Sequence, residues 1–222
     1  MNDKIFLIIQ CATHLICLLV SLYVIIPLGT HLNDFHGHCA LFSCGHYIED
    51  DGHFEPEWAN KSPCIISILI GSFTFICSFV QIFMKLRLLY TNAECTFFHA
   101  FLCFFFDCIL VLLVLIDGII TTLGFYIWCD CVTQRFSSCS IAASVMEIGI
   151  NSTIVAKNFS YQLGIVQFGI WALLVCACLQ LMLSMRKVFL YHERLNLIAG
   201  MSSERRRHHH HRSEGYSSLN EQ

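Results

Sequence analysis

The feature that most constrains this chain is a long apolar stretch from Phe97 to Trp128 that contains two carboxylates, Asp107 and Asp117. Its apolar length exceeds the ~18 residues that indicate a membrane span. A helix over residues 97–127 would be about 46 Å long at ~1.5 Å per residue. This length exceeds a hydrocarbon layer of about 30 Å, so the helix has to tilt or project from the bilayer. Each of its many Leu, Ile, Val and Phe residues favours insertion by ~0.3–0.6 kcal/mol, and together they outweigh two aspartates at ~2.5–3.5 kcal/mol each.

The other apolar residues form three further blocks, and 56% of the whole chain is apolar. The predicted membrane spans are residues 5–28, 64–84, 97–127 and 163–185. This pattern predicts an all-α membrane protein with one four-transmembrane-helix bundle over residues 1–200. The first block could instead be a signal peptide. Its apolar run is longer than the about 7–15 residues of such peptides and it lacks a small-residue cleavage pattern, so we interpret it as a retained span.

Basic residues predict the orientation of the bundle. Four spans place both termini on one side, and of the 13 Lys and Arg residues only Lys61, Arg135 and Lys157 fall on the other. The positive-inside tendency then predicts cytoplasmic termini, with outer loops at 29–63 and 128–162. Residues 201–222 are rich in Ser, Arg, His and Glu and predict a disordered cytoplasmic tail. The basic segment from Arg205 to Arg212 either lies on anionic lipid or is solvated.

Six cysteines fall in the predicted outer loops: Cys39, Cys44, Cys64, Cys129, Cys131 and Cys139. In an oxidising compartment an even number predicts up to three disulfides, and spacing leaves all fifteen pairings open. The alternative is a zinc site formed by Asp34, His36, His38 and Cys39. That segment has no paired Cys-x-x-Cys, so we favour a disulfide for Cys39 and predict no metal.

Three N-glycosylation sequons begin at Asn60, Asn151 and Asn158, all on the side predicted to be outer. Asn151 is the favoured acceptor because Pro63 and the second span follow closely after Asn60. In the tail, Tyr216 and Leu219 fit a tyrosine-based sorting signal, although four-residue matches are frequent.

The two intramembrane aspartates allow two interpretations. Asp107 and Asp117 are about 15 Å apart along an α-helix and ~80° apart around it, so they cannot share a proton or hold one cation together. An intramembrane carboxylate is by default a functional hypothesis, here an ion pathway or a bond to another subunit. The other interpretation, which we favour, is a protonated side chain bonded to a neighbouring helix.

Signatures of an enzyme are missing from the sequence. It contains no H-E-x-x-H, G-x-S-x-G or phosphate-binding loop, and Cys129-Asp130-Cys131 is not the C-x-x-C of thiol oxidoreductases. We therefore predict no catalysis, no cofactor and no small-molecule substrate. The net charge of −3 carries no indication of nucleic-acid binding.

Several stretches together resemble the transmembrane protein 179 family. They are Pro27-Leu28, residues 34–42 (Asp-Phe-His-Gly-His-Cys-Ala-Leu-Phe), residues 124–130 (Gly-Phe-Tyr-Ile-Trp-Cys-Asp) and residues 167–172 (Gln-Phe-Gly-Ile-Trp-Ala). The resemblance extends to about Leu197 and implies a four-span membrane protein with two outer loops. It also implies that Cys39, Cys64, Cys129 and Cys139 form two bridges, which leaves Cys44 and Cys131 as a further pair.

Two functions from different classes follow from these observations. The first is a non-enzymatic tetraspan of the plasma membrane or an endomembrane, acting as an accessory, organising or trafficking partner of other membrane proteins. Its partners would be the lipid bilayer and either a lateral membrane protein or further copies of itself. The alternative is an oligomeric ion channel or transporter that uses Asp107 and Asp117.

Overall fold

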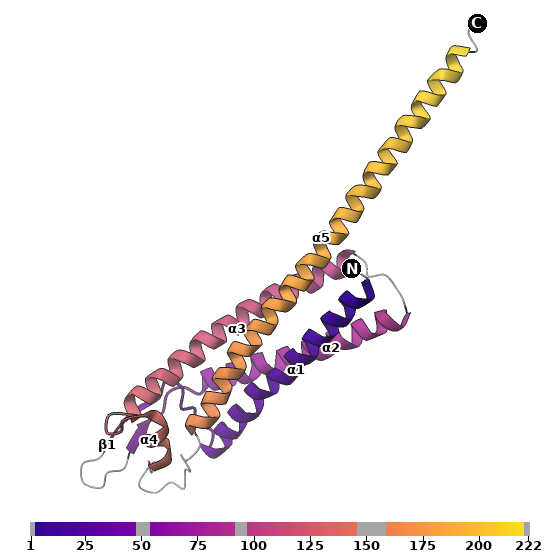
Figure 1. The fold of residues 1–222 in the computed structure, drawn as a ribbon. Coiled ribbons are helices and arrows are strands. Elements are labelled where there is room, and N and C mark those ends of the chain that lie inside the picture. Colours follow the sequence, from indigo (N-terminus) through magenta and orange to yellow (C-terminus); the bar gives the residue numbers. More distant parts are fainter. Residues whose placement is uncertain (1–2, 48–53, 92–96, 146–158, 220–222) are drawn as a thin grey trace.

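The computed structural model describes residues 3–47, 54–91, 97–145 and 159–219 (Figure 1). The long helices are α1 (Asp3–Asp34), α2 (Ser62–Thr91), α3 (Phe97–Val132) and α5 (Phe159–Leu219). A hairpin of β1 (Cys44–Tyr47) and β2 (Phe54–Glu57) follows α1, and the short α4 (Cys139–Val145) follows α3. Each long helix contains a segment long and apolar enough to cross a membrane. The predicted four-helix membrane bundle is therefore confirmed.

Helix α1 occupies the centre of the packing, because it contacts both α2 and α5 along much of its length, while α3 packs mainly on α5. Small residues allow these close approaches. A Cβ at Gly71 of α2 would lie 3.1 Å from Ile25 of α1, and one at Gly169 of α5 would lie 3.2 Å from the Tyr23 backbone. Such small-residue contacts are typical of helices that pack within lipid.

The bundle carries polar side chains inside and large apolar side chains outside. On α1, Gln10, His14, Cys17 and Ser21 recur at helical spacing and are all buried. Large apolar residues such as Leu69, Ile76 and Phe79 of α2 are 59–61% exposed. In water this pattern would be unfavourable, but in a bilayer the exposed residues face acyl chains. The exterior therefore agrees with a bundle surrounded by lipid.

Backbone hydrogen bonds and a left-handed turn end α1. The Gly37 N–H donates to Leu32 O at 2.7 Å and the His36 N–H donates to Asn33 O at 3.2 Å. This pair of bonds is the Schellman arrangement. His36 has a φ of 52° and Gly37 a φ of 85°. The left-handed turn directs the chain back over the end of the bundle, where the hairpin forms.

The structure adds to the sequence prediction at two places. The loop between α1 and α2 contains the antiparallel β1–β2 pair, in which His46 faces Glu55 and Tyr47 faces Phe54. We did not predict this hairpin, because four-residue strands give little periodicity. Helix α5 also continues to Leu219, into the segment 201–222 for which the sequence predicts disorder, and the disorder of the tail stays a prediction. This segment contains no proline, and extending an existing helix avoids the unfavourable nucleation step.

Candidate functional site: the cap and the bundle core

Chemistry-bearing residues gather in two places. We call the first the cap, which consists of the described residues within 35–61 and 128–145, together with Phe159, at the end of the bundle opposite the termini (Figure 1). We call the second the bundle core, the buried side chains between α1, α2, α3 and α5. The two meet where α2 begins and α3 nears its end.

Three disulfides close the cap. Cys39 pairs with Cys64, Cys44 pairs with Cys131, and Cys129 pairs with Cys139. The first joins the chain after α1 to the start of α2, the second joins β1 to the end of α3, and the third joins that end to α4. The prediction of disulfide bonds is thus confirmed; the bonds connect the hairpin and α4 to α3, and the segment after α1 to α2.

The cap has its own aromatic core around Trp128, which is fully buried. Trp58 stacks on Trp128 at 6.1 Å between ring centroids, while Phe54 and Phe159 meet it edge-on at 5.8 and 5.7 Å. These rings come from β2, from the segment before α2 and from the start of α5. Trp128 therefore joins three parts of the chain at the boundary between cap and bundle.

Tyr47 fixes the hairpin to α3 without a covalent bond. Its hydroxyl donates to Val132 O at 2.7 Å, and the Arg135 guanidinium lies 5.0 Å from the centre of its ring. Burial raises the pKa of Tyr47, and the nearby Arg135 partly opposes this rise. The phenol consequently keeps its proton at neutral pH and remains a donor.

Gly124 allows the cap to approach α3 closely. The Phe42 N–H donates to Gly124 O at 3.2 Å, and a Cβ at position 124 would lie 2.8 Å from the Phe42 ring. Phe42 has a φ of 63°, which is unusual for a non-glycine residue. The segment 34–42 and the segment 124–130, which carried the family resemblance, thus contact each other at this point.

The residues predicted as an alternative zinc site are used differently. Cys39 is in a disulfide, Asp34 Oδ2 accepts from Gln162 Nε2 at 2.8 Å, and His36 lies in the left-handed turn after α1 with a φ of 52°. His38 stacks on Trp58 at 4.9 Å. In the part of the chain that the structure describes, no three His, Cys, Asp or Glu side chains are placed to hold a metal.

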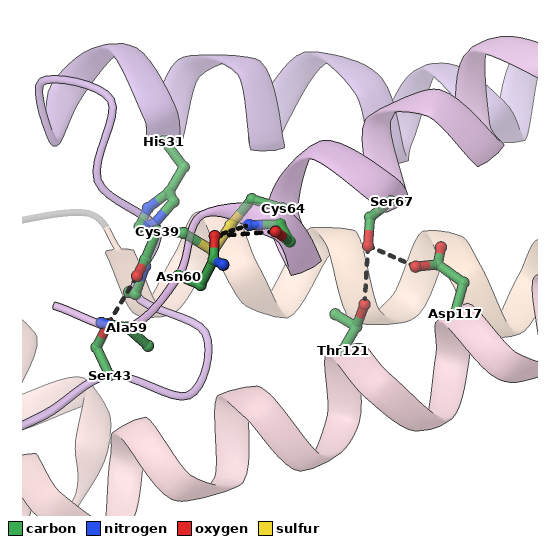
Figure 2. Close-up of a disulfide and its surroundings, with 11 residues drawn as sticks. His31, Cys39, Ser43, Ala59, Asn60, Cys64, Ser67, Asp117 and Thr121 are labelled. Carbon is green, nitrogen blue, oxygen red and sulfur yellow. Dashed lines mark hydrogen bonds between the residues drawn. A yellow bond between two sulfur atoms is a disulfide. The ribbon is translucent and has the colours of Figure 1, made fainter.

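Asp117 lies in the bundle core directly beneath the cap. Ser67 Oγ donates to Asp117 Oδ1 and also lies 3.3 Å from Thr121 Oγ1. Ser67 is three residues, about one helical turn, after Cys64 on α2, and Figure 2 shows its hydroxyl beside Asp117 and Thr121, to the right of the disulfide at Cys64. Ser67 belongs to α2 and the other two residues to α3, so the carboxyl is bonded to a neighbouring helix.

Asp107 lies in a separate polar group nearer the termini. Ser184 Oγ of α5 donates to Asp107 Oδ2. Lys85 is only 7% exposed, and its Nζ lies 2.9 Å from His14 Nε2, while Gln180 Nε2 lies 2.8 Å from His14 Nδ1. Because an ammonium only donates, His14 Nε2 accepts from Lys85. All four long helices contribute to this group.

Sequence reasoning missed the inward position of Lys85, which we counted only as a basic residue on the terminal side. A signal was present, because Ser67, Gly71, Thr74, Ser78 and Lys85 recur on one face of α2 and all of them are buried. The matching polar face of α1, which includes His14, could have indicated its partner. Only the packing of the helices shows that Lys85 reaches His14.

Several predicted positions lie outside the described residues. Asn151 and Asn158 fall there, as do the side chains of Tyr216 and Leu219. Asn60 is described and exposed: its Oδ1 accepts from the Ser62 N–H at 3.1 Å and from the Ser62 hydroxyl at 2.9 Å (Figure 2). Asn60 therefore forms an Asx turn just before α2 begins.

A comparison with known protein families shows which family this chain belongs to. The family model described as "Transmembrane protein 179/179B Claudin domain" matches residues 6–209. The chain therefore belongs to this family, as the resemblance in its sequence predicted. No solved structure matches it. Together with the four apolar helices, this membership identifies an integral multi-pass membrane protein.

Proposed function

We propose that this member of the transmembrane protein 179/179B claudin-domain family is a non-enzymatic tetraspan that binds other membrane proteins laterally. It would act as an accessory subunit, organiser or trafficking partner. The observation that carries the proposal is that the intramembrane carboxyls are used to join helices. Asp117 binds Ser67 of α2, and Asp107 binds Ser184 of α5. Groups engaged in this way stabilise a scaffold, and three disulfides hold its cap in one shape.

The proposed orientation places the cap in the lumen or outside the cell and both termini in the cytoplasm. Disulfides support this orientation because they persist in oxidising compartments. Glycosylation provides the test. We expect Asn151→Gln to remove one glycosidase-sensitive mass increment, while Asn60→Gln leaves it unchanged because the Asx turn and Pro63 disfavour that sequon. An unglycosylated chain, together with protease cleavage of the loop at 128–162 in selectively permeabilised cells whose internal membranes remain sealed, would contradict the orientation.

The function itself is tested by native purification. The full chain, expressed near its natural level, is extracted in a mild detergent, and proteins that co-elute in stoichiometric amount are identified by mass spectrometry. We expect one dominant channel, receptor or transporter. A matched sample with both Cys39 and Cys64 replaced by serine should lose that partner if the cap supplies the contact. Elution of the chain without any other membrane protein would contradict an accessory role.

The alternative is an oligomeric channel or transporter that uses Asp107 and Asp117. Two observations place it second: the carboxyls occupy separate sites, and each is bonded to a serine hydroxyl. The double variant with both aspartates replaced by asparagine, reconstituted in liposomes, decides the question. Flux from wild type that disappears in this variant would favour the channel and would contradict the scaffold proposal. Absence of flux from wild type would exclude the channel.

A further inference from the structure

A groove lies on the outside of the bundle where α1, α4 and α5 meet. Its volume is about 620 Å³, within the ~300–1,000 Å³ that is typical of sites for small ligands. Tyr23 of α1, Ser140 of α4 and Phe168 of α5 line its three sides. Tyr161, which also lines it, and Phe168 are 73% and 69% exposed, so the groove is open toward lipid. We call this feature the α1–α4–α5 groove.

The elements that form the groove are held in place. Helix α4 packs inward through Ala142 and Ala143, which are 0% and 3% exposed, and it contacts α5. The disulfide between Cys129 and Cys139 joins the first residue of α4 to the end of α3. Figure 1 shows α4 beside the start of α5. The groove is therefore already formed before a ligand enters, as most small-ligand sites are.

Polarity along the groove changes with depth in the membrane. Ser160 lies three residues before the predicted span 163–185, and Phe168 lies five residues inside it. Tyr23 is five residues before the end of the predicted span 5–28. At ~1.5 Å per residue, Ser160 is about 4–5 Å outside the hydrocarbon, and Tyr23 and Phe168 are about 7–8 Å inside it. The groove thus offers hydroxyls at the interface and aromatic rings below them.

The lining of the groove favours a neutral ligand. None of the described residues that line it carries a charge. A lipid phosphate is bound by Arg, Lys or converging N–H groups, which this lining lacks. Between described residues, the hydroxyls of Ser160 and Tyr161 have no hydrogen-bond partner. A ligand hydroxyl both donates and accepts, so it can pair with either of them.

The openness of the groove favours a rigid ligand. An open groove makes few contacts with its occupant, so the entropy lost on binding decides whether the occupant stays. A flexible acyl chain loses rotational freedom at many bonds, whereas a fused ring system has little to lose. Gly164 lines the groove without a side chain, and a Cβ there would meet nothing within 4 Å. This position leaves room for a flat ring face against α5.

We propose that the α1–α4–α5 groove binds a sterol from the membrane leaflet on the cap side. Its single hydroxyl pairs with the hydroxyls at the mouth of the groove, from Ser140, Ser160 and Tyr161. Its ring system lies deeper, against Gly164 and Phe168. A sterol combines the three properties that the groove selects, because it is neutral, rigid and polar only at one end. This ligand site goes beyond the proposed association with other membrane proteins and does not depend on it.

Photoaffinity labelling tests the proposal on the full chain. The protein is reconstituted in phosphatidylcholine vesicles that contain a cholesterol analogue with a diazirine on its ring system, and the labelled peptides are identified by mass spectrometry. We expect saturable labelling within residues 159–168 or at Tyr23, displaced by unlabelled cholesterol. Labelling that does not saturate, or that is spread evenly over the outer faces of α2 and α3, would show general contact with lipid and would overturn the site.

Filling the groove should remove binding. Gly164→Leu places a side chain where the ring system would lie, and the open space around Gly164 lets the variant fold. We expect the mole fraction of analogue that gives half-maximal labelling to rise about tenfold or more. Gly29→Leu is the matched control, because a Cβ at Gly29 also meets nothing within 4 Å and this residue does not line the groove. Equal labelling of the two variants would contradict the site.

Removing one hydroxyl tests how the polar end is held. Tyr161→Phe keeps the ring, so its fold should be unaffected, and half-maximal labelling should need about 2–10 times more analogue. Tyr126→Phe, at a residue of α3 that is 68% exposed, is the control and should match wild type. Ser160 stays unchanged because it belongs to the sequon at Asn158. Equal values for the two tyrosine variants would contradict the proposed position of the hydroxyl.

Competition identifies the occupant. Cholesterol should displace the analogue better than its epimer with an inverted hydroxyl, a diacylglycerol or added phosphatidylcholine. Equal displacement by the diacylglycerol or the phospholipid would assign the groove to acyl chains and overturn the sterol. A chain that fails these tests but still co-purifies with another membrane protein would leave the proposed function intact. A chain that binds the sterol but no other membrane protein would do the reverse.

Discussion

The cap and the bundle core are stabilised by different interactions. The cap contains three disulfides and a cluster of stacked aromatic rings around Trp128. The described core contains no disulfide, and its helices are joined by side-chain hydrogen bonds and by contacts at glycines. The boundary between these two modes lies at Cys64 and Ser67, one turn apart on α2 (Figure 2).

The difference follows from the solvent that each region meets. In water, apolar burial stabilises packing, but a cap of this size encloses few large side chains, so covalent bonds supplement it. In lipid, apolar burial between helices gives little net driving force, because acyl chains solvate leucine as well as another helix does. Close packing and polar pairs then distinguish one helix arrangement from another. Four predictions test this contrast, in order of decreasing effect.

Breaking the disulfide between Cys44 and Cys131 should have the largest effect, and it should be confined to the cap. This bond spans 87 residues and the bond between Cys39 and Cys64 spans 25. In the chain-entropy model, which treats each loop as fully unfolded, the losses are at most about 4–5 and about 3–4 kcal/mol, and they are smaller where α2 and α3 stay folded. Two variants, each with both cysteines of one disulfide replaced by serine, are unfolded by heat in detergent. Their unfolding temperatures show which disulfide contributes more to stability. A helical content that falls together with cap unfolding would show that the two regions are not separate.

Gly169→Val should separate α1 from α5. A Cβ there would lie 3.1–3.2 Å from Tyr23 and Val24, whereas a Cβ at Gly164 would meet nothing within 4 Å. We expect the first variant to lose ~1–3 kcal/mol of stability through overpacking. The matched Gly164→Val variant should lose much less. Their unfolding midpoints in the same detergent provide the measurement, and equal midpoints would show that close packing at Gly169 does not stabilise the bundle.

Lys85→Met should weaken the bundle core while leaving the cap unchanged. The substitution keeps the length of the side chain but removes the ammonium that contacts His14 at 2.9 Å. We expect a loss of about 1 kcal/mol, typical of an interhelical hydrogen bond in lipid. Lys61→Met, at an exposed position in the cap, is the control. The free energy of unfolding, measured with the disulfides intact, should fall only for Lys85→Met. An unchanged free energy for Lys85→Met would mean that the contact with His14 is energetically neutral.

Tyr47→Phe should have the smallest effect, because it removes one hydroxyl from a cap that disulfides already hold together. The lost bond to Val132 O is 2.7 Å long. A net contribution near the lower end of ~0.5–1.5 kcal/mol is expected for such a bond, because the disulfides hold the hairpin in place without it. Tyr90→Phe, at a residue that is 89% exposed, is the matched control. The free energy of unfolding of the two variants is measured with the disulfides intact and after reduction. If reduction does not enlarge the difference between Tyr47→Phe and Tyr90→Phe, the Tyr47 hydrogen bond stabilises the cap independently of the disulfides.

The sequence alone determined the architecture of this protein. Four apolar blocks, of which residues 97–127 are the longest, require four helices because backbone polar groups cannot remain unpaired in lipid. The cysteines of the outer loops likewise predicted disulfides, and quoted stretches such as residues 124–130 indicated the family. These properties depend on composition, length and local pattern, so they can be read without knowing which helices touch.

The tertiary structure decided which residues meet. Lys85 could have extended to the membrane surface, but the packing of α1 against α2 places His14 within its reach. Asp107 and Asp117 acquire serine partners on two different helices, and the side chains of Gln167 and Thr122 meet at the lipid-exposed side. Each of these contacts joins residues far apart in the chain. Their formation depends on the rotation and depth of whole helices, which packing fixes and a single sequence pattern does not.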